Sequence, residues 1–397
     1  MSTVVPVRAI AFLSLAAFAS AATLRATDPL LPQIAAEFGT TTGSAGRVVT
    51  AFAVSYGLLQ IAFGPLAERW GKYLFVTVMT ALCAVGALLC AASGSLDALA
   101  AARLLSGATA GPLIPISMAF IGDAVPYAQR QRVLARFLAG QILGVALGQV
   151  IGGFVGERYG WRAPFLFLAG LYLVAATCLL LEWRRNPSVR ARPAAASAPG
   201  AGYFATIGVV LRRPWPRTLL AIVAIEGFAI YGPFPFIAAH LHEAFGVSLA
   251  AAGAVVACFA LGGLAFAFAV SPLVARLRER GLAGLGGAVL FFAYGGLAFA
   301  PAVWAVVPLM FLLGFGYYML HNTLQTNATQ MAPEARGVGM SLFATAFFTG
   351  QSLGVAASAI AVDTVGAQAA FAVAGLMLLA LAFEFRRRLG ARPRSAA

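Results

Sequence analysis

The sequence predicts an all-α polytopic membrane protein in which twelve transmembrane helices form two parallel six-helix repeats. The first observation is composition, because 61% of the 397 residues are hydrophobic and only 10% are charged. That balance excludes a soluble globular domain. The second observation is that the apolar residues gather in twelve stretches, each close to the roughly 20 residues that cross a bilayer as a helix. The third is a sequence similarity between stretches that lie six spans apart.

The twelve predicted spans follow one another with short polar connections. Arg8 and the apolar residues after it resemble a secretory signal peptide. Removal of this segment would leave two unequal halves, so we expect the segment to remain as the first span. The four cysteines fall inside spans without metal-ligand spacing, so we expect neither a disulfide nor a metal site. The spans cover approximately residues 9–35, 46–66, 73–93, 98–121, 134–156, 162–182, 217–239, 248–270, 283–301, 304–326, 338–361 and 367–384.

The net charge of +14 follows the topology of these spans. With the N-terminus inside, the predicted cytoplasmic segments hold 22 of the 27 basic residues, and the outer segments hold only Arg47, Arg158 and Arg162. Cytoplasmic loops of membrane proteins are enriched in Lys and Arg. We therefore predict a multi-pass protein with both termini in the cytoplasm, whose basic residues meet anionic lipid and not nucleic acid.

One long polar connection divides the chain into two halves. Residues 186–216 are rich in Pro, Ala, Ser and Arg, which is typical of a linker. Within this linker, residues 203–211 predict a short helix that lies on the membrane surface. The predicted domains are an N-terminal six-helix bundle at 1–185 and a C-terminal six-helix bundle at 217–397.

The two halves repeat each other in sequence. Residues 140–146 (GQILGVA) in the fifth span match residues 350–356 (GQSLGVA) in the eleventh, at an offset of 210. Residues 168–171 in the sixth span match residues 373–376 in the twelfth, at an offset of 205. An even number of spans in each repeat gives both halves the same orientation. Transporters built in this way carry a substrate site between the halves, near the middle of the membrane.

A charged turn joins the second and third spans. Because it is too short to cross the membrane again, the two spans form a hairpin whose tip lies in water. Its two glycines permit a tight backbone, and its charges mark the end of the lipid layer. The turn contains Gly64, Glu68, Arg69, Gly71 and Lys72.

The spacing of this turn resembles the loop between helices 2 and 3 of the major facilitator superfamily. Glu68 stands in place of the usual Asp, and Tyr73 replaces the last basic residue of the pattern. The resemblance implies the major facilitator fold, transport by alternating access without a cofactor, and a cytoplasmic gate function for the loop.

Other spans are similar to the drug:proton antiporter branch of that superfamily. Asp28 and the proline after it resemble the end of helix 1, and Arg103 and its neighbours are similar to a helix 4 motif whose Arg assists proton coupling. Residues 144–153 resemble the glycine motif of helix 5. Gln149 stands where that motif usually has Pro, and this departure leaves the antiport assignment open.

Glycines recur every four residues along the fifth span. Gly140, Gly144, Gly148 and Gly152 lie on one helix face, with Gly153 beside them. Without side chains they let another helix approach closely. The face serves either static packing or sliding during conformational change. The resemblance to the family's helix 5 implies that its partner is a helix of the C-terminal half.

Charged residues inside spans are costly and usually face a polar cavity. Glu226 lies nine residues past Arg217, or roughly 13 Å along the seventh span at 1.5 Å per residue. A carboxyl buried there without a partner is protonated at neutral pH. We interpret Glu226 as a protonation switch or an anchor for a cationic substrate, with a satisfied structural carboxyl as the alternative.

Three further charges lie in the outer halves of the first and fourth spans. Arg25 and Asp28 are three residues apart on one helix face, so they can pair, either for proton coupling or as a pair at the outer surface. Arg103 can pair with Asp28, balance a proton-binding acid, or form a structural bond between helices.

The tenth span is too polar to face lipid. His321 and Gln325 share one face, as do Tyr318 and Asn322, which predicts a cavity lining, with interhelical hydrogen bonds as the alternative. His321 titrates near neutrality if it meets a cavity. On the seventh span, Tyr231 is a candidate aromatic wall for an apolar substrate.

No catalytic triad, metal cluster or nucleotide-binding loop is visible, so the sequence predicts neither an enzyme nor an ATP-driven pump. We predict proton-coupled export of a small organic molecule, a drug-like compound or a metabolite, by a monomer in the lipid bilayer. The alternative is a facilitator or importer of a sugar or another metabolite. A membrane receptor or a membrane-embedded enzyme is less favoured. The preference for Arg over Lys indicates a GC-rich bacterial genome, and hence the inner membrane.

Overall fold

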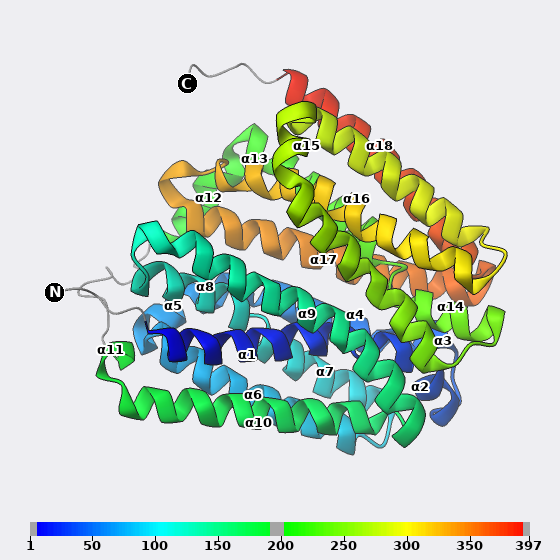
Figure 1. The fold of residues 1–397 in the computed structure, drawn as a ribbon, viewed down its shortest axis with the longest axis horizontal. Coiled ribbons are helices and arrows are strands. Elements are labelled where there is room, and N and C mark those ends of the chain that lie inside the picture. The colour runs from blue at the N-terminus through cyan, green and yellow to red at the C-terminus, as the bar shows by residue number, and fades with distance from the viewer. Residues whose placement is uncertain (1–5, 191–201, 392–397) are drawn as a thin grey trace.

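The computed structural model describes residues 6–190 and 202–391, and every regular element in that part of the chain is a helix (Figure 1). The first half contains α1 (Val7–Arg25), η1 (Asp28–Leu30), α2 (Leu31–Glu37), α3 (Thr42–Ala45), α4 (Arg47–Leu58), α5 (Gln60–Trp70), α6 (Lys72–Ala92), α7 (Leu96–Ala110), α8 (Leu113–Ala124), α9 (Tyr127–Tyr159) and α10 (Arg162–Arg185). The second half contains α13 (Pro214–Tyr231), α14 (Phe236–Phe245), α15 (Leu249–Ala298), α16 (Val303–Thr329), η2 (Pro333–Ala335), α17 (Arg336–Val365) and α18 (Ala367–Ala391).

These helices account for twelve membrane crossings. Within the described ranges, ten helices are long and apolar enough to span a membrane, and the bent segment α3 to α5, with a 54° change of direction, adds an eleventh. α15 is 50 residues long, about 75 Å at 1.5 Å per residue, which is more than two hydrocarbon cores. Its backbone leaves the helical region at Arg278 (φ 54°, ψ 179°), so α15 consists of two consecutive spans. The predicted fold class is confirmed.

Arg278 occupies a backbone conformation that side chains with a Cβ rarely adopt, and such residues store about 1–3 kcal/mol of strain. Replacing Arg278 with glycine is therefore expected to raise the melting temperature of the purified protein. Arg280→Gly is the matched control, because Arg280 lies in the helix just beyond the break and glycine there lowers stability. A lower melting temperature for Arg278→Gly would show that this connection is not strained.

The connection between the second and third spans is shorter than predicted. Helix α5 extends to Trp70 and α6 begins at Lys72, so Gly71 alone joins them, with φ of 89°. Gly64 lies inside α5 and not in a turn, because the helix continues through Pro65 to the charged residues. Gly160 (φ 82°), with Trp161 after it, and Gly366 (φ 91°) alone make similarly short connections at corresponding places in the two halves, 206 residues apart.

The linker carries two short helices, α11 (Pro187–Arg190) and α12 (Gly202–Arg212). The helix predicted at 203–211 is therefore present. Val210 of α12 is fully buried in the core of the second half, which anchors this end of the linker.

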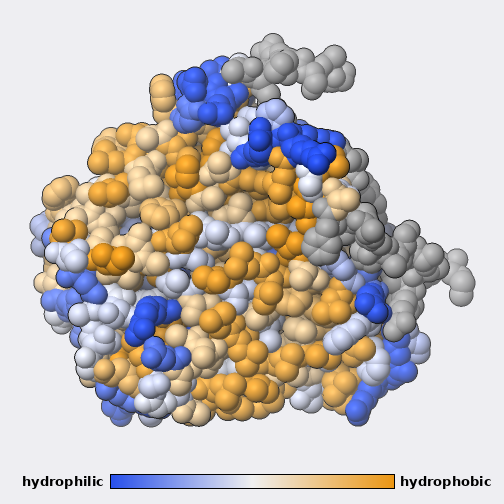
Figure 2. Space-filling model, turned by 180° about the vertical axis from the view of Figure 1, so that it is seen from behind, coloured by the Kyte–Doolittle hydropathy of each residue, from blue (hydrophilic) through white to orange (hydrophobic). Residues whose placement is uncertain are grey.

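Each half has its own apolar core. One cluster of buried side chains runs from Val210 to Phe385 and the other from Ala9 to Val189. The face seen in Figure 2 is largely apolar, with most of its hydrophilic groups toward the edges, as expected for a surface that meets lipid. Phe268, Phe299 and Trp304, for example, are at least three-quarters exposed.

The two halves meet most closely at one end. We call the side on which the chain begins and ends the terminal face, and the opposite side the far face. Figure 1 shows the halves converging near α2, α3 and α14, at the far face. A third buried cluster there combines side chains from both halves, including Leu31, Val48, Phe236 and Val355. The two halves are therefore sealed against each other at the far face.

Candidate functional site

The glycine face of α9 packs inside the first half and not against the second. A Cβ built on Gly148 would lie 2.5 Å from the Ala22 carbonyl oxygen, and Gly144 and Gly152 meet the backbone of α1 in the same way. The expected contact with the C-terminal half is wrong for these residues, because periodicity identifies a face but not its partner. Gly153, on the neighbouring side of α9, does approach Leu249 and Ala250 of α15.

The same seam occurs in the second half. Gly144 packs on the carbonyl of Phe18, and Gly354 of α17 packs on the carbonyl of Phe228 of α13. Both members of the second pair lie 210 residues after those of the first. The repeat found in the sequence is therefore a repeat of backbone contacts.

Arg25 and Asp28 form a buried ion pair at the far end of α1. Their side chains are 2% and 1% exposed, and Arg25 Nη1 lies 3.7 Å from Asp28 Oδ2. Gln149 of α9 donates a hydrogen bond of 2.9 Å to the same carboxylate oxygen. The pair is therefore inside the protein and not at the outer surface.

Arg25 also reaches across to the second half. Its guanidinium carbon lies 4.0 Å from the centre of the Tyr231 ring and 5.0 Å from that of Phe234, distances at which a cation is attracted to an aromatic face. Tyr231 thus lies at the interface between the halves, where its ring contacts Arg25.

Arg103 holds helices together. It donates hydrogen bonds of 3.3 Å to the carbonyl oxygens of Val48 and Thr23, and its guanidinium lies 4.1 Å from the Phe52 ring centre. These contacts join α7 to α1 and α4. The structure favours the structural bond between helices over a direct pair with Asp28.

Glu226 has a partner that the sequence did not indicate. Its Oε2 lies 2.9 Å from Nδ1 of His321 on α16, and the carboxyl is completely buried while His321 is 15% exposed. The other oxygen, Oε1, has no hydrogen-bond partner among the described residues. The sequence left the partner of this carboxyl open, because a contact between residues 95 positions apart depends on how α13 and α16 pack.

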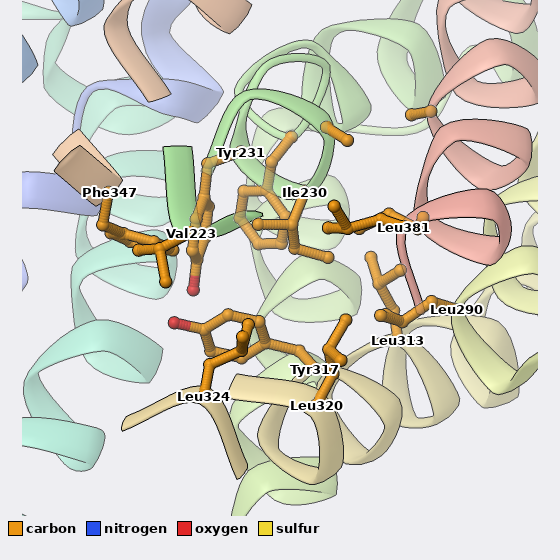
Figure 3. Close-up of a cluster of buried hydrophobic side chains, with 14 of the residues drawn as sticks. Val223, Ile230, Tyr231, Leu290, Leu313, Tyr317, Leu320, Leu324, Phe347 and Leu381 are labelled. Atoms are coloured by element: carbon orange, nitrogen blue, oxygen red, sulfur yellow. The ribbon is translucent and has the colours of Figure 1, made fainter. Parts of the chain in front are cut away.

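Aromatic rings surround this pair. Tyr317 stacks on His321 with ring centres 4.9 Å apart, and Phe347 of α17 lies 4.9 Å from the same imidazole. Tyr231 lies 5.4 Å from Tyr317, and Figure 3 shows the hydroxyl ends of the two tyrosines pointing toward each other. These rings connect the Glu226–His321 pair to the guanidinium of Arg25.

The remaining polar residues of α16 lie elsewhere. Tyr318 packs on Gly263 of α15. Asn322 is half-buried and Gln325 is exposed. Gln149 and Gln351, in contrast, are almost completely buried, and within residues 6–190 and 202–391 both have amide atoms without hydrogen-bond partners. Sequence reasoning missed them as site residues, although an uncharged amide inside an apolar span is itself a signal.

The charged loop after α5 pairs within its own half. Lys72 Nζ lies 2.8 Å from Glu68 and 2.5 Å from Asp123 at the end of α8. Glu68 thus pairs with Lys72, four residues further along the chain. Arg69 is exposed.

The chain is similar to known proteins in both sequence and fold. It matches the family model of the Major Facilitator Superfamily over residues 13–354 and 219–396. A "Probable sugar efflux transporter" of Helicobacter pylori strain HPAG1 is 25% identical to it, over 94% of this chain and 93% of that one.

Other relatives match over shorter stretches. An uncharacterised MFS-type transporter of Bacillus subtilis is 23% identical over 68% of this chain, which spans 63% of that relative's length. The multidrug export protein EmrB of Escherichia coli K12 is 29% identical over 45% of this chain and 36% of its own. Among solved structures, a bacterial homologue of the human lysosomal transporter Spinster superposes with a TM-score of 0.78 at 17% identity, over 98% of this chain and 99% of that one.

Proposed function

The chain is a member of the Major Facilitator Superfamily, and from that membership we propose that it exports a small organic cation in exchange for protons. Export is what the names of the Helicobacter and Escherichia relatives describe for those proteins. The observation that carries the proposal is the completely buried Glu226 carboxyl, paired with a partly exposed His321.

The pair can bind one proton in a defined way. When the Nδ1–H group of neutral His321 donates a hydrogen bond to ionised Glu226, the pair carries one negative charge. A proton that arrives at Nε2 of the imidazole allows the Nδ1 proton to move onto Glu226, which leaves a neutral acid beside a neutral imidazole. The pair is then uncharged, and its proton entered through the more exposed partner.

A cationic substrate and a proton compete for this negative charge. Glu226 Oε1 has no hydrogen-bond partner in the part of the chain that the structure describes, so it can accept a hydrogen bond from an ammonium group. The faces of Tyr231, Tyr317 and Phe347 provide favourable contacts for an apolar cation. Because only one of the two occupants is bound at a time, the proton and the substrate move in opposite directions.

The direction of transport follows from the proposed orientation. The distribution of basic residues supports a cytoplasmic terminal face in the inner membrane. The sealed far face then corresponds to a state that takes up substrate from the cytoplasm. After rearrangement of the halves, protons from the acidic outer side displace the substrate.

The test uses purified protein in liposomes with a trapped pH-sensitive dye. An imposed pH gradient, acidic inside vesicles whose terminal face points outward, is measured while hydrophobic amines or neutral sugars are added outside. Faster collapse of the gradient on addition of amines would support the proposal. Substrate flux at a rate independent of the gradient would indicate a facilitator, and response to a sugar alone would indicate a neutral substrate.

We propose that the loop around Glu68 is the gate that holds the terminal face closed when the far face is open. Glu68→Ala and Arg69→Ala are each expected to lower the maximal transport rate while KM changes little, because they alter the equilibrium between states and not the binding site. Arg47→Ala, which removes an exposed ion pair with Asp97 at the far end, is the control. A raised KM with an unchanged rate would contradict a gating role.

A further inference from the structure

At the far face, a carboxylate from each half binds the start of a helix in the other half. Asp363 of α17 accepts hydrogen bonds from the Thr41 hydroxyl, at 2.5 Å, and from the backbone N–H of Gly43, at 3.0 Å. Glu157 of α9 accepts a hydrogen bond of 2.7 Å from the backbone N–H of Ala250. The two contacts cross the interface in opposite directions.

These contacts are copies of one another. Asp363 follows Glu157 by 206 residues, and Ala250 follows Gly43 by 207. The residue that caps each helix also corresponds: the Thr41 hydroxyl accepts from Ser44 N and the Ser248 hydroxyl from Ala251 N, each at 3.1 Å. These offsets agree with the repeat offsets of 205 and 210 between the halves. Each half therefore supplies one acid, near the end of its fifth span, and one helix start, from its second span.

The physical basis is the partial positive charge at a helix N-terminus. The first backbone N–H groups have no partner inside the helix, so an anion placed there is stabilised by hydrogen bonds and by the helix dipole. The donors in both contacts are backbone amides or a hydroxyl and not basic side chains. Each contact therefore depends on the negative charge of its carboxylate. At the start of α3, the Thr42 hydroxyl also donates a hydrogen bond of 2.7 Å to Glu243 of α14.

Close backbone packing accompanies both contacts. A Cβ on Gly43 would lie 2.5 Å from the carboxyl carbon of Asp363, and a Cβ on Gly153 would lie 3.1 Å from the Leu249 carbonyl carbon. Each acid thus sits where two helices of different halves approach without intervening side chains. Separating the halves at the far face must break both contacts together.

We propose that Asp363 and Glu157 are a duplicated pair of gating residues that hold the far face shut by their charge. The inference rests on the alternating-access part of the proposed function and is independent of Glu226 and of the substrate. Neutralising either acid shifts the population toward the conformation in which the far face is open, and neutralising both shifts it further.

The test measures distances across the far face without any substrate. Spin labels are attached to cysteines introduced by Arg158→Cys in the first half and Ala244→Cys in the second, both exposed positions, in a protein whose four native cysteines are replaced by alanine. Asp363→Asn and Glu157→Gln keep the size and hydrogen-bonding atoms of each acid and remove its charge. Each is expected to increase the ratio of long to short distances by about two- to fivefold, the usual strength of a charge at a helix end.

The matched control is Glu37→Gln. Glu37 is also a far-face carboxylate, but its partners, Trp161 and Arg162, belong to its own half. It is expected to leave the distance distribution unchanged. An unchanged distribution in the Asp363→Asn, Glu157→Gln double variant would overturn the inference, and an effect of only one acid would overturn the duplicated gate. If the distances shift but the protein fails every proton-exchange assay, the gating role of Asp363 and Glu157 is supported and the proposed exchange of substrate for protons is rejected.

Discussion

Glu226→Gln is expected to abolish transport driven by a pH gradient, while substrate exchange across the membrane continues only at raised substrate concentration, because the carboxylate that binds the cation is lost. Glutamine keeps the shape of the side chain and a hydrogen-bond acceptor for His321, but it cannot change charge. The pair then stays neutral on both sides of the membrane, so binding of substrate no longer releases a proton. The measurement compares gradient-driven flux with equilibrium exchange of labelled substrate in the same liposomes.

Glu182→Gln is the matched control for this experiment. Glu182 is also largely buried, but it lies on α10 and accepts a hydrogen bond of 2.9 Å from Asn186, away from the interface between the halves. Its neutralisation is expected to leave gradient-driven transport intact. Wild-type transport and pH dependence in Glu226→Gln would contradict the proposed role, and Asp28 would become the next candidate for the proton site.

Gly148→Ala is expected to destabilise the first half strongly, and Gly148→Leu to prevent a folded, active protein. The added Cβ would lie 2.5 Å from the Ala22 carbonyl oxygen, so α1 and α9 must move apart. Overpacking of this kind costs about 1–3 kcal/mol. The readouts are the melting temperature in detergent and the yield of monodisperse protein.

The same face contains its own control. A Cβ on Gly140 would lie 3.8 Å from the Ser14 carbonyl oxygen, which is an ordinary contact. Gly140→Ala is therefore expected to fold normally, whereas Gly354→Ala in the second half should reproduce the defect of Gly148→Ala. Equal melting temperatures for Gly140→Ala and Gly148→Ala would contradict a backbone seam and indicate a lipid-facing surface.

The architecture could be predicted from the sequence because it depends on local properties. Span length follows from bilayer thickness, and the repeat follows from matched residues such as Gly144 and Gly354. The Arg25–Asp28 pair could also be predicted, because residues three apart on a helix are neighbours whatever surrounds them.

Contacts between distant spans could not be predicted in this way. Glu226 and His321 are each recognisable as unusual in an apolar span, but their pairing depends on the relative rotation of α13 and α16. The partner of the α9 glycine face was wrong for the same reason. The far-face acids carried no signal at all, because Glu157 and Asp363 lie at span ends, where charged residues are ordinary.

Arg25 gives the central cluster a competitor that belongs to the chain itself. Its guanidinium already covers the face of Tyr231, at 4.0 Å, and its covalent attachment keeps it at a high effective concentration there. A small hydrophilic cation can make only the same cation–π contact with Tyr231 that Arg25 already makes. A bulky hydrophobic amine also buries apolar surface against Tyr317 and Phe347. This additional binding free energy lets it displace Arg25, so the competition favours hydrophobic amines over small hydrophilic cations.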